Sequence, residues 1–461
     1  MDLKGKRVTV IGLGNSGVNA AFLLAKHGAK VWATDAGNSS ELKKTGEKLK
    51  ARKISVEIGA HTEDFVKGSD LVVVSPGVED SSQALKWAAL HNIPVIGEME
   101  LGYRFCKGRI IAVTGTNGKS TVTTLIGDIL RAGKADVVVC GNIGNSLCGE
   151  VDNIKKDTWV VLEVSSAQLE RIERFKPRIA VILNITDDHM DRYKNFYEYF
   201  NHKLKIFRNQ DEDDILILNY DAENLRRIKG LARSRVLFYA KGAVAVSGYD
   251  VAAYVKDDWI CCICGKSEKE VVHLNDIKLR GVHNLENAVV SSLVGMIAGV
   301  AERPIRDAVR GFTGLRHRFE TVATIEGVEY IDDSKGTTVD STKRALESCE
   351  KPVVLIAGGK DKHSDYTVIK DVVEDKVRHL VLIGEAADEI KKALKDVVSV
   401  HEAKDMNEAV DLSGRFAKDG WIVLLSPMCS SFDMYKDYKE RGDKFREAVD
   451  KLKDRLDTAK A

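Results

Sequence analysis

Thr114-Gly-Thr-Asn-Gly-Lys-Ser-Thr121 follows the apolar run Arg109-Ile-Ile-Ala-Val113 and leads into a segment with helical spacing. A glycine-containing loop between a strand and a helix is typical of phosphate-binding loops, where backbone N–H groups and a lysine contact the phosphates. The usual motif has another glycine at the position of Val113. Because Gly115 and Gly118 still free two backbone amides, the stretch predicts a shortened phosphate loop.

Within this loop, Lys119 is expected to contact the β- and γ-phosphates of a nucleotide, and the Ser120 hydroxyl to ligate Mg²⁺. A tight turn without ligand could use the same glycines, but a chance Gly-Lys-Ser-Thr between a strand and a helix is rare. The predicted nucleotide-binding residues of the loop are Gly115, Thr116, Asn117, Gly118, Lys119, Ser120 and Thr121.

A second glycine motif, Gly12-Leu-Gly-Asn-Ser-Gly17, matches the dinucleotide fingerprint, and Asp35 ends the next strand at about the expected distance. It predicts a site for a diphosphate and a ribose-like hydroxyl. A dinucleotide and a UDP-linked sugar both offer these groups, and a tight turn without ligand is a further alternative.

Composition excludes several classes of protein. The chain has 461 residues, a net charge of +1, 44% hydrophobic and 30% charged residues, which fits a globular protein of about three domains. No basic block indicates a nucleic-acid partner, and no apolar run reaches the roughly 18 residues of a membrane span. The eight scattered cysteines favour a reducing, cytoplasmic setting. Cys261-Cys-Ile-Cys264 has metal-ligand spacing in its outer pair, but without a second pair we interpret these residues as reduced thiols on a small strand.

Apolar runs alternate with helical patterns along the chain, which is typical of parallel sheets covered by helices. We therefore predict an α/β protein with three domains, residues 1–97, 98–314 and 315–461, divided near Gly97 and Gly314. The first and third domains are expected to be Rossmann-like, and the central one a parallel sheet of the P-loop ATPase type. The expected strands are Val8–Ile11, Lys30–Thr34, Asp70–Ser75, Arg109–Val113, Trp159–Val164, Ile179–Asn184, Val353–Ala357, His379–Ile383 and Trp421–Leu425, and a charged helix is expected over Asp437–Lys453.

Six further motifs resemble the Mur ligases. In that family the shortened loop Thr-Gly-Thr-Asn-Gly-Lys is the normal form. The resemblance covers nearly the whole chain in order, except for about residues 225–278. The motifs are Gly141-Asn-Ile-Gly144, Glu163-Val-Ser-Ser-Ala-Gln-Leu169, Asn184-Ile-Thr-Asp-Asp-His-Met-Asp-Arg-Tyr193, Gly281-Val-His-Asn-Leu-Glu-Asn287, His317-Arg-Phe-Glu320 and Asp333-Ser-Lys335.

The resemblance implies an ATP-dependent amide ligase of peptidoglycan precursor synthesis. Ser426-Pro-Met-Cys-Ser-Ser-Phe-Asp433, followed by Tyr438 and Arg441-Gly442, is similar to the members that join D-glutamate to UDP-N-acetylmuramoyl-L-alanine. These two molecules are the expected substrates, and ATP and two Mg²⁺ ions the expected cofactors. We expect a cytoplasmic monomer with no nucleic-acid partner and no membrane insertion. Ala36-Gly37 departs from the basic or polar residue that some members carry after the first-domain aspartate.

The resemblance also assigns roles to single residues. Ser120 and Glu163 would hold one Mg²⁺ and His189 a second, while Asn142 would contact the γ-phosphate or the reacting carboxylate. The predicted catalytic residues are Lys119, Asn142, Glu163, His189, Lys203 and Arg318. Closure of the third domain is expected to complete the nucleotide site, whose further contacts are Asn284, Asn287, Arg318, Asp333 and Lys335. The predicted substrate-binding residues are Asn15, Ser16, Asp35 and Gly77 in the first domain, and Thr337, Lys362, Ser431, Phe432 and Tyr438 in the third.

Lys203 carries the least obvious of these assignments. An ammonium group cannot ligate Mg²⁺, so chemistry alone would make Lys203 a helix-surface lysine, as we expect for Lys205. The resemblance implies instead a carbamylated lysine, formed when the neutral amine captures CO₂. A nearby Mg²⁺ would disfavour the ammonium form, and the product would be a carboxylate that helps to position a metal beside His189.

Three other functions are compatible with parts of the sequence. A Mur-type or folylpolyglutamate-type ligase with a different amino acid would keep the loop and the three domains. An NAD-dependent oxidoreductase would use the first glycine motif and leave Lys119 without a role. A nucleotide switch would need no amino-acid pocket, and the guanine-specific motif of such proteins is absent from the sequence.

Overall fold

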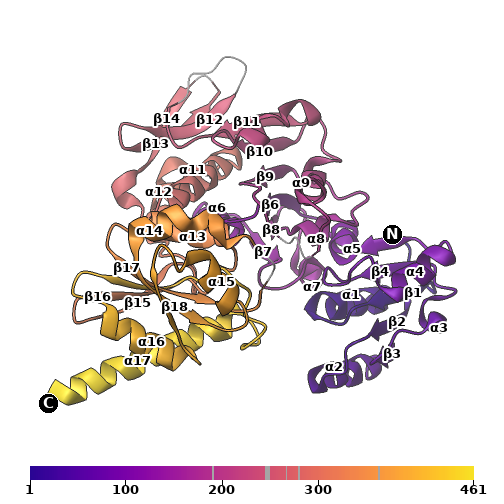
Figure 1. The fold of residues 1–461 in the computed structure, drawn as a ribbon. Coiled ribbons are helices and arrows are strands. Elements are labelled where there is room, and N and C mark those ends of the chain that lie inside the picture. The colour runs from indigo at the N-terminus through magenta and orange to yellow at the C-terminus, as the bar shows by residue number, and fades with distance from the viewer. Residues whose placement is uncertain (189–191, 244–249, 266, 279–280, 362–363, 461) are drawn as a thin grey trace. The chain divides into compact units, whose positions relative to one another are not determined.

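The computed structural model describes residues 1–188, 192–243, 250–265, 267–278, 281–361 and 364–460, which form three mostly parallel sheets with covering helices (Figure 1). Contacts within the chain divide it into two compact units. One unit comprises Met1–Ile185, Tyr197–Asp276 and Ala288–Val309. The other comprises Thr186–Phe196, Ile277–Asn287 and Arg310–Ala461.

The first sheet has five parallel strands in the order β3-β2-β1-β4-β5. Val8 to Ile11 are fully buried, as expected for a strand covered on both faces. β1 lies between β2 and β4, so the strand order reverses beside its carboxyl end, where open α/β sheets bind ligands. The elements are β1 (Arg7–Ile11), α1 (Asn15–Lys26), β2 (Lys30–Asp35), α2 (Ser40–Lys50), β3 (Ser55–Ile58), α3 (Glu63–Val66), β4 (Leu71–Val74), α4 (Gln83–Leu90), β5 (Val95–Gly97) and α5 (Glu98–Phe105).

The second sheet has nine strands in the order β14-β13-β12-β11-β10-β9-β6-β8-β7, parallel from β7 through β12. Its first part contains β6 (Arg109–Thr114), α6 (Lys119–Ala132), β7 (Val137–Gly141), α7 (Leu147–Glu150), β8 (Trp159–Glu163), α8 (Ser166–Leu169), β9 (Ile179–Ile182) and α9 (Phe196–Leu204). Its second part contains β10 (Ile215–Asn219), α10 (Glu223–Arg226), β11 (Arg235–Tyr239), β12 (Val251–Lys256), β13 (Trp259–Cys264) and β14 (Ser267–His273), followed by α11 (Val282–Ile297) and α12 (Glu302–Gly311).

Glu100 of α5 ties the first sheet to the second within their common unit. Its carboxylate is fully buried and accepts hydrogen bonds from the N–H groups of Glu173, Arg174 and Phe175, at distances of 2.9 to 3.1 Å. Arg104 Nε donates to the same carboxylate at 2.9 Å. A buried charge is stable only when it is paired in this way, so Glu100 fixes the chain where it enters β9.

The antiparallel strands β12, β13 and β14 lie in the region without a recognisable motif, where the sequence predicted only a small strand at Cys261–Cys264. Cys261 and Cys262 of β13 are buried opposite Glu270 and Lys269 of β14, and both are free thiols. Within the described part of the chain, neither belongs to a group of side chains with metal-ligand spacing. The two cysteines lie on a strand, and the interpretation of the cluster as reduced thiols stays a prediction, because the side chain of Cys264 lies outside the described residues.

The third sheet has six strands in the order β15-β16-β20-β17-β18-β19, of which only β15 is antiparallel. The elements of its first half are β15 (Glu320–Ile325), β16 (Val328–Asp332), α13 (Val339–Glu347), β17 (Val353–Gly358), α14 (Lys370–Lys376) and β18 (Val377–Ile383). Those of the second half are α15 (Ala387–Leu394), β19 (Ser399–Glu402), α16 (Met406–Phe416), β20 (Ile422–Leu425) and α17 (Tyr438–Lys460).

The predicted α/β class with three parallel-rich parts is confirmed, and each expected strand is present with small shifts at its ends. The expected C-terminal helix is longer than predicted and runs to Lys460. The domain boundaries near Gly97 and Gly314 stay predictions. Among the residues that the structure describes, no helix combines the length and the apolar character needed to cross a membrane.

Candidate active site

The predicted phosphate loop connects β6 to α6 at the carboxyl edge of the second sheet. Gly118 precedes the first turn of α6 with φ 83°, and Gly115 has φ 155°, both in the region that favours glycine. A Cβ atom on Gly115 would also lie 3.2 Å from the carbonyl oxygen of Asn184. The two glycines are therefore required by the turn itself, and the N–H groups at the start of α6 face the end where an anion would bind.

Asn184, just after β9, holds the loop in shape. Its Oδ1 atom accepts a hydrogen bond from Asn117 N–H at 2.8 Å, and its Nδ2 atom donates to Asn117 O at 3.2 Å. Its carbonyl oxygen accepts from Thr116 N–H at 2.9 Å. The sequence placed Asn184 in a motif without giving it a role, although its position at the end of an apolar strand is a usable signal.

Two lysine side chains meet at one carbonyl oxygen of the loop. Lys119 Nζ donates to Gly115 O at 2.9 Å and to Thr116 O at 2.8 Å. Lys203 Nζ, on α9, donates to the same Gly115 oxygen at 2.8 Å. Since like charges repel strongly away from water, two ammonium groups at one oxygen indicate a site suited to an anion.

Lys203 is only 2% exposed, so its interpretation as a helix-surface lysine is wrong. Its ammonium group lies 4.7 Å from the ring centre of Tyr199, one turn earlier on α9. The Tyr199 hydroxyl lies 3.0 Å from Thr116 Oγ1. Tyr199 was missed, although residues four apart share one helix face. Lys205 is partly buried and donates to Glu170 O at 2.8 Å, so it is not a freely solvated lysine either.

Asn142 and Glu163 lie together at the ends of the neighbouring strands β7 and β8. Asn142 Nδ2 donates to Glu163 Oε1 at 2.8 Å, and Asn142 N–H donates to Glu163 O at 2.9 Å. Glu163 is 2% exposed, and its Oε2 atom is buried without a hydrogen-bond partner among the described residues. A buried carboxylate oxygen without a donor is costly, and oxygen ligands suit Mg²⁺, so this side chain fits the metal-binding role. His189 lies outside the described residues.

The first glycine motif forms the turn between β1 and α1. Gly12 has φ 86°, and a Cβ atom on Gly17 would lie 1.8 Å from Gly12 O. These two glycines are explained by the close approach of α1 to the turn. A Cβ atom on Gly14 would meet no atom within 4 Å, so the chain is open there. The start of α1, with Asn15 and Ser16, could thus receive a diphosphate.

Asp35 shapes this turn. Its Oδ2 atom accepts from Leu13 N–H at 2.7 Å, and its Oδ1 atom accepts from Gly37 N–H at 2.8 Å. The carboxylate therefore joins the loops after β1 and β2 at the predicted substrate site. Gly77 lies exposed in the loop after β4, the strand on the other side of β1.

In the second unit, the buried guanidinium of Arg441 joins three loops at the carboxyl edge of the third sheet. It is 0% exposed and donates to Ser334 Oγ at 3.0 Å and to Ser334 O at 2.8 Å. It also donates to the carbonyl oxygens of Cys429, Ser430 and Gly358, at 3.1, 3.2 and 3.4 Å. Burial lowers the pKa of Arg441 to about 10, so the group keeps its charge at neutral pH. Arg441 therefore holds together the segments that carry the predicted phosphate contacts and the predicted amino-acid contacts.

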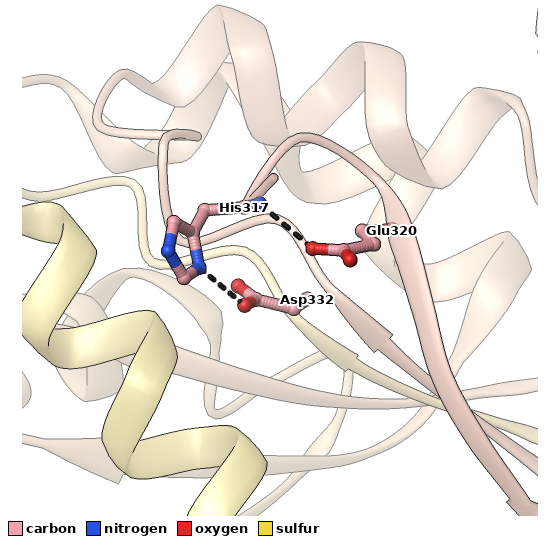
Figure 2. Close-up of side chains that lie close together, drawn as sticks. All are labelled: His317, Glu320 and Asp332. Carbon is pink, nitrogen blue, oxygen red and sulfur yellow. Dashed lines mark hydrogen bonds and ion pairs between the residues drawn. The ribbon is translucent and has the colours of Figure 1, made fainter. Parts of the chain in front are cut away.

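His317 and Asp332 form a buried pair beside α17 (Figure 2). His317 Nδ1 lies 2.7 Å from Asp332 Oδ2, and His317 N–H donates to Glu320 Oε2 at 3.0 Å. The spacing of His317, Glu320 and Asp332 would suit a cation. However, Asp332 Oδ2 and Glu320 Oε2 already take part in hydrogen bonds within the protein. His317 and Phe319 have φ of 64° and 49°. The network therefore holds a strained turn that carries Arg318.

Asp333 follows this pair at the end of β16. Its carboxylate accepts from Ser426 Oγ at 2.8 Å and from Phe319 N–H at 3.2 Å. Burial raises the pKa of the Asp333 carboxyl to about 7, although the Ser426 hydrogen bond and the Arg318 charge both oppose this rise. Lys335 Nζ lies 4.0 Å from the ring centre of Tyr438. The structure thus brings Asp333, Arg318, Lys335 and Tyr438 into one region.

The remaining predicted residues have distinct positions. Ser431 is buried, whereas the Phe432 ring is 69% exposed, and Thr337 N–H donates to Lys335 O at 2.8 Å. Lys362 lies outside the described residues. Asn284 and Asn287 are buried in the first two turns of α11, with Asn287 Nδ2 3.2 Å from Asn284 Oδ1. Because α11 begins at Val282, both residues lie inside the helix near its start and neither is its cap.

A parallel sheet with a phosphate loop, two converging lysines and a buried carboxylate defines a nucleotide-dependent enzyme. Comparison with known protein families narrows this class. Residues 6–97 match the model of the Mur ligase MurD-like N-terminal domain, residues 113–295 the Mur ligase middle domain, and residues 317–429 the Mur ligase, glutamate ligase domain.

Curated relatives align over nearly the whole chain. A UDP-N-acetylmuramoylalanine–D-glutamate ligase of Koribacter versatilis is 44% identical over 98% of this chain and 99% of its own. Proteins of the same name from Acidobacterium capsulatum and Geotalea daltonii are 42% and 41% identical, over 97% of this chain and 97% and 98% of theirs. The chain belongs to the Mur ligase family.

Solved structures share the fold at low identity. A pseudomurein peptide ligase type C from Methanothermus fervidus superposes with a TM-score of 0.61 at 17% identity, over 97% of this chain and 100% of that one. A UDP-N-acetylmuramate-alanine ligase from Thermotoga maritima gives a TM-score of 0.60 at 18% identity, with the same coverage.

Replacing Gly442 by alanine should destabilise the second unit. A Cβ atom there would lie 2.2 Å from His317 Nδ1 and 2.8 Å from Asp332 Oδ2. Overpacking of this kind costs about 1–3 kcal/mol, and we expect a thermal midpoint several degrees lower. Gly311→Ala at the end of α12 is the control, since its Cβ atom would meet nothing within 4 Å. An unchanged midpoint for Gly442→Ala would contradict the packing described.

Asp333→Asn should change the pH dependence of stability. The folded state holds the Asp333 proton up to about pH 7, whereas an ordinary aspartate releases it near pH 4. The parent protein therefore loses stability from this group as the pH rises through that window, and the neutral asparagine does not. Urea unfolding at pH 4.5 and pH 8 should show Asp333→Asn gaining stability relative to the parent at the higher pH. An equal difference at both pH values would contradict the raised pKa.

Proposed function

We propose that this protein joins D-glutamate to the alanyl carboxylate of UDP-N-acetylmuramoyl-L-alanine, coupled to the cleavage of ATP to ADP and phosphate. The observation that carries the proposal is the 41–44% identity with D-glutamate ligases over nearly the full chain. The paired lysines at Gly115 and the buried carboxylate of Glu163 support the phosphoryl-transfer part of this reaction.

In the first step, an oxygen of the alanyl carboxylate attacks the γ-phosphorus of ATP, and ADP leaves. The product is an acyl phosphate, which supplies the leaving group that a carboxylate lacks. Lys119 would turn from the loop carbonyls to the β- and γ-phosphates and neutralise their charge. Asn142 would donate a hydrogen bond to the reacting carboxylate or to the γ-phosphate.

Two Mg²⁺ ions are proposed to neutralise charge on the phosphate oxygens. Ser120 and Glu163 would hold one of them, for which the Glu163 oxygen without a donor is suited. His189 and a carbamylated Lys203 would hold the other. Carbamylation is supported by the burial of Lys203 beside Lys119, since two neighbouring ammonium groups favour the loss of a proton from one of them.

In the second step, the amine of D-glutamate attacks the acyl carbon and phosphate leaves, with loss of one proton from nitrogen. Lys362, Ser431 and Phe432 are proposed to bind its carboxylates, with support from Thr337 and Tyr438. Asn284 and Asn287 would hydrogen-bond the adenine, while Arg318, Asp333 and Lys335 would contact the ribose and phosphates. Asn15, Ser16, Asp35 and Gly77 would hold the UDP end of the other substrate.

A panel of amino acids tests the proposed function. Phosphate release from ATP should require the UDP-linked substrate and should be fastest with D-glutamate, against L-glutamate, D-aspartate, L-lysine and meso-diaminopimelate. An anionic side chain suits a pocket that contains Lys362 and the Ser431 hydroxyl. Equal turnover with diaminopimelate or L-lysine would show a different member of the family, and release without any acceptor would show a nucleotide switch.

Lys203→Ala should lose nearly all turnover, and added formate or acetate should restore part of it. A small carboxylate can occupy the place of the lost carbamate, whereas no small anion replaces an ammonium group. Lys205→Ala, one residue beyond the end of α9, is the matched control, because its ammonium group contacts Glu170 O and not the phosphate loop. Normal turnover of Lys203→Ala, or rescue by amines rather than carboxylates, would refute the carbamate.

A further inference from the structure

The side chain of Asn145 joins α1 to the loop after β7. Its Oδ1 atom accepts hydrogen bonds from Asn19 Nδ2 at 2.7 Å and from Ser146 N–H at 3.1 Å, and Asn15 Nδ2 lies 3.5 Å away. Its Nδ2 atom donates to Glu150 Oε1 at 2.9 Å. The oxygen of the Asn145 amide therefore contacts α1, and its nitrogen contacts α7.

The direction of the hydrogen bond between Asn19 and Asn145 is fixed. A backbone N–H can only donate, so the Asn145 atom that faces Ser146 N–H must be the oxygen. Asn19 must then present its NH₂ group, which also lies 3.2 Å from Ser146 Oγ. An aspartate in place of Asn19 would have the same shape but would set two oxygens against each other.

Gly149 leaves the space that the side chains of Asn19 and Asn145 occupy. A Cβ atom on Gly149 would lie 2.8 Å from Asn19 Nδ2 and 2.6 Å from Asn145 Nδ2, so α7 needs a glycine there. The start of α7 is held in turn by Glu98 of α5, whose Oε1 atom accepts from Cys148 N–H at 2.9 Å. The helices α1, α5 and α7 pack against one another around this point.

The two segments that meet at Asn145 have different proposed roles toward one substrate. Asn15 and Ser16, in the first turn of α1, are proposed to bind the diphosphate. The loop that Asn145 closes, through Gly141 N–H to Asn145 O at 2.8 Å, carries Asn142, which is proposed to contact the alanyl carboxylate. The diphosphate end and the reacting end of the substrate are thus held by segments that touch through one amide.

We propose that the hydrogen bond between Asn19 and Asn145 sets the spacing between the diphosphate and the alanyl carboxylate of the bound UDP-linked substrate. This inference rests on the proposed function. Asn19 and Asn145 are positioning residues that do not touch the reacting atoms. Through them, binding energy from the nucleotide end of the substrate holds the carboxylate in line with the γ-phosphate.

Three variants test this role, namely Asn19→Asp, Asn145→Ala and the double variant. The dissociation constant of the UDP-linked substrate, measured by calorimetry, should stay within about threefold because none of the variants replaces a residue that is proposed to bind the diphosphate. The kcat should fall about tenfold or more, since a displacement of about 1 Å can cost about 10²-fold in rate. The double variant should be no slower than the slower single variant, because both remove the same contact.

Asn153→Asp is the matched control. Asn153 Nδ2 donates to Glu150 Oε2 at 3.2 Å, so it shares the carboxylate that Asn145 uses, but the bond is exposed and lies within α7 and the turn that follows it. The same isosteric change there should leave kcat unchanged. Thermal melting of each variant confirms that it is folded.

Three results would overturn the inference. They are a kcat for Asn19→Asp within twofold of the parent, a dissociation constant that rises as much as kcat falls, and losses that multiply in the double variant. An inactive parent enzyme would refute the proposed function itself. An active parent with an unaffected Asn19→Asp variant would refute only the positioning role.

Discussion

The carbonyl oxygen of Gly115 accepts hydrogen bonds from two lysines, and the proposed nucleotide site at the carboxyl edge of the central sheet depends on that contact. Lys119 comes from α6, the helix that follows β6. Lys203 lies 88 residues after Gly115, on α9. Both cations are held at the carboxyl edge of the sheet, where β8 ends with Glu163, whose Oε2 atom has no hydrogen-bond partner among the described residues. Positive groups and a buried carboxylate oxygen at one edge of a sheet suit a metal nucleotide, because the cations offset the charge of the phosphates and the carboxylate offsets the charge of the metal.

In the second unit, a single cation supplies hydrogen-bond donors to the carbonyl oxygens of several loops. Loops at the end of a parallel sheet lack regular hydrogen bonds, and their carbonyl oxygens must find donors. The Arg441 guanidinium supplies these donors to Ser334, Gly358, Cys429 and Ser430. Next to it, Gly442 leaves the space in which the His317–Asp332 pair is formed. One turn of α17 thus shapes the loops around the predicted nucleotide and amino-acid contacts of this unit.

The sequence predicts the sheets well and their side-chain contacts poorly. Apolar runs such as Val353–Ala357 mark buried parallel strands, because both faces of these strands are covered. The strands β12 to β14 gave no such signal, since β14 begins with four exposed residues and its pairing depends on a partner strand. The roles of Asn184 and Tyr199 depend on partners 67 and 83 residues away, which no local pattern reveals. The burial of Lys203 was missed for the same reason, because it follows from the packing of α9 over the loop.

Activation of the alanyl carboxylate as an acyl phosphate is tested most directly by the transfer of its oxygen. The UDP-linked substrate is prepared with ¹⁸O in both oxygens of the alanyl carboxylate and is turned over with ATP and D-glutamate. If the carboxylate attacks the γ-phosphorus, the bridging oxygen leaves with phosphate, so each phosphate released should carry one ¹⁸O atom by mass spectrometry. Phosphate free of ¹⁸O, formed together with the amide product, would contradict the acyl phosphate and the account built on it.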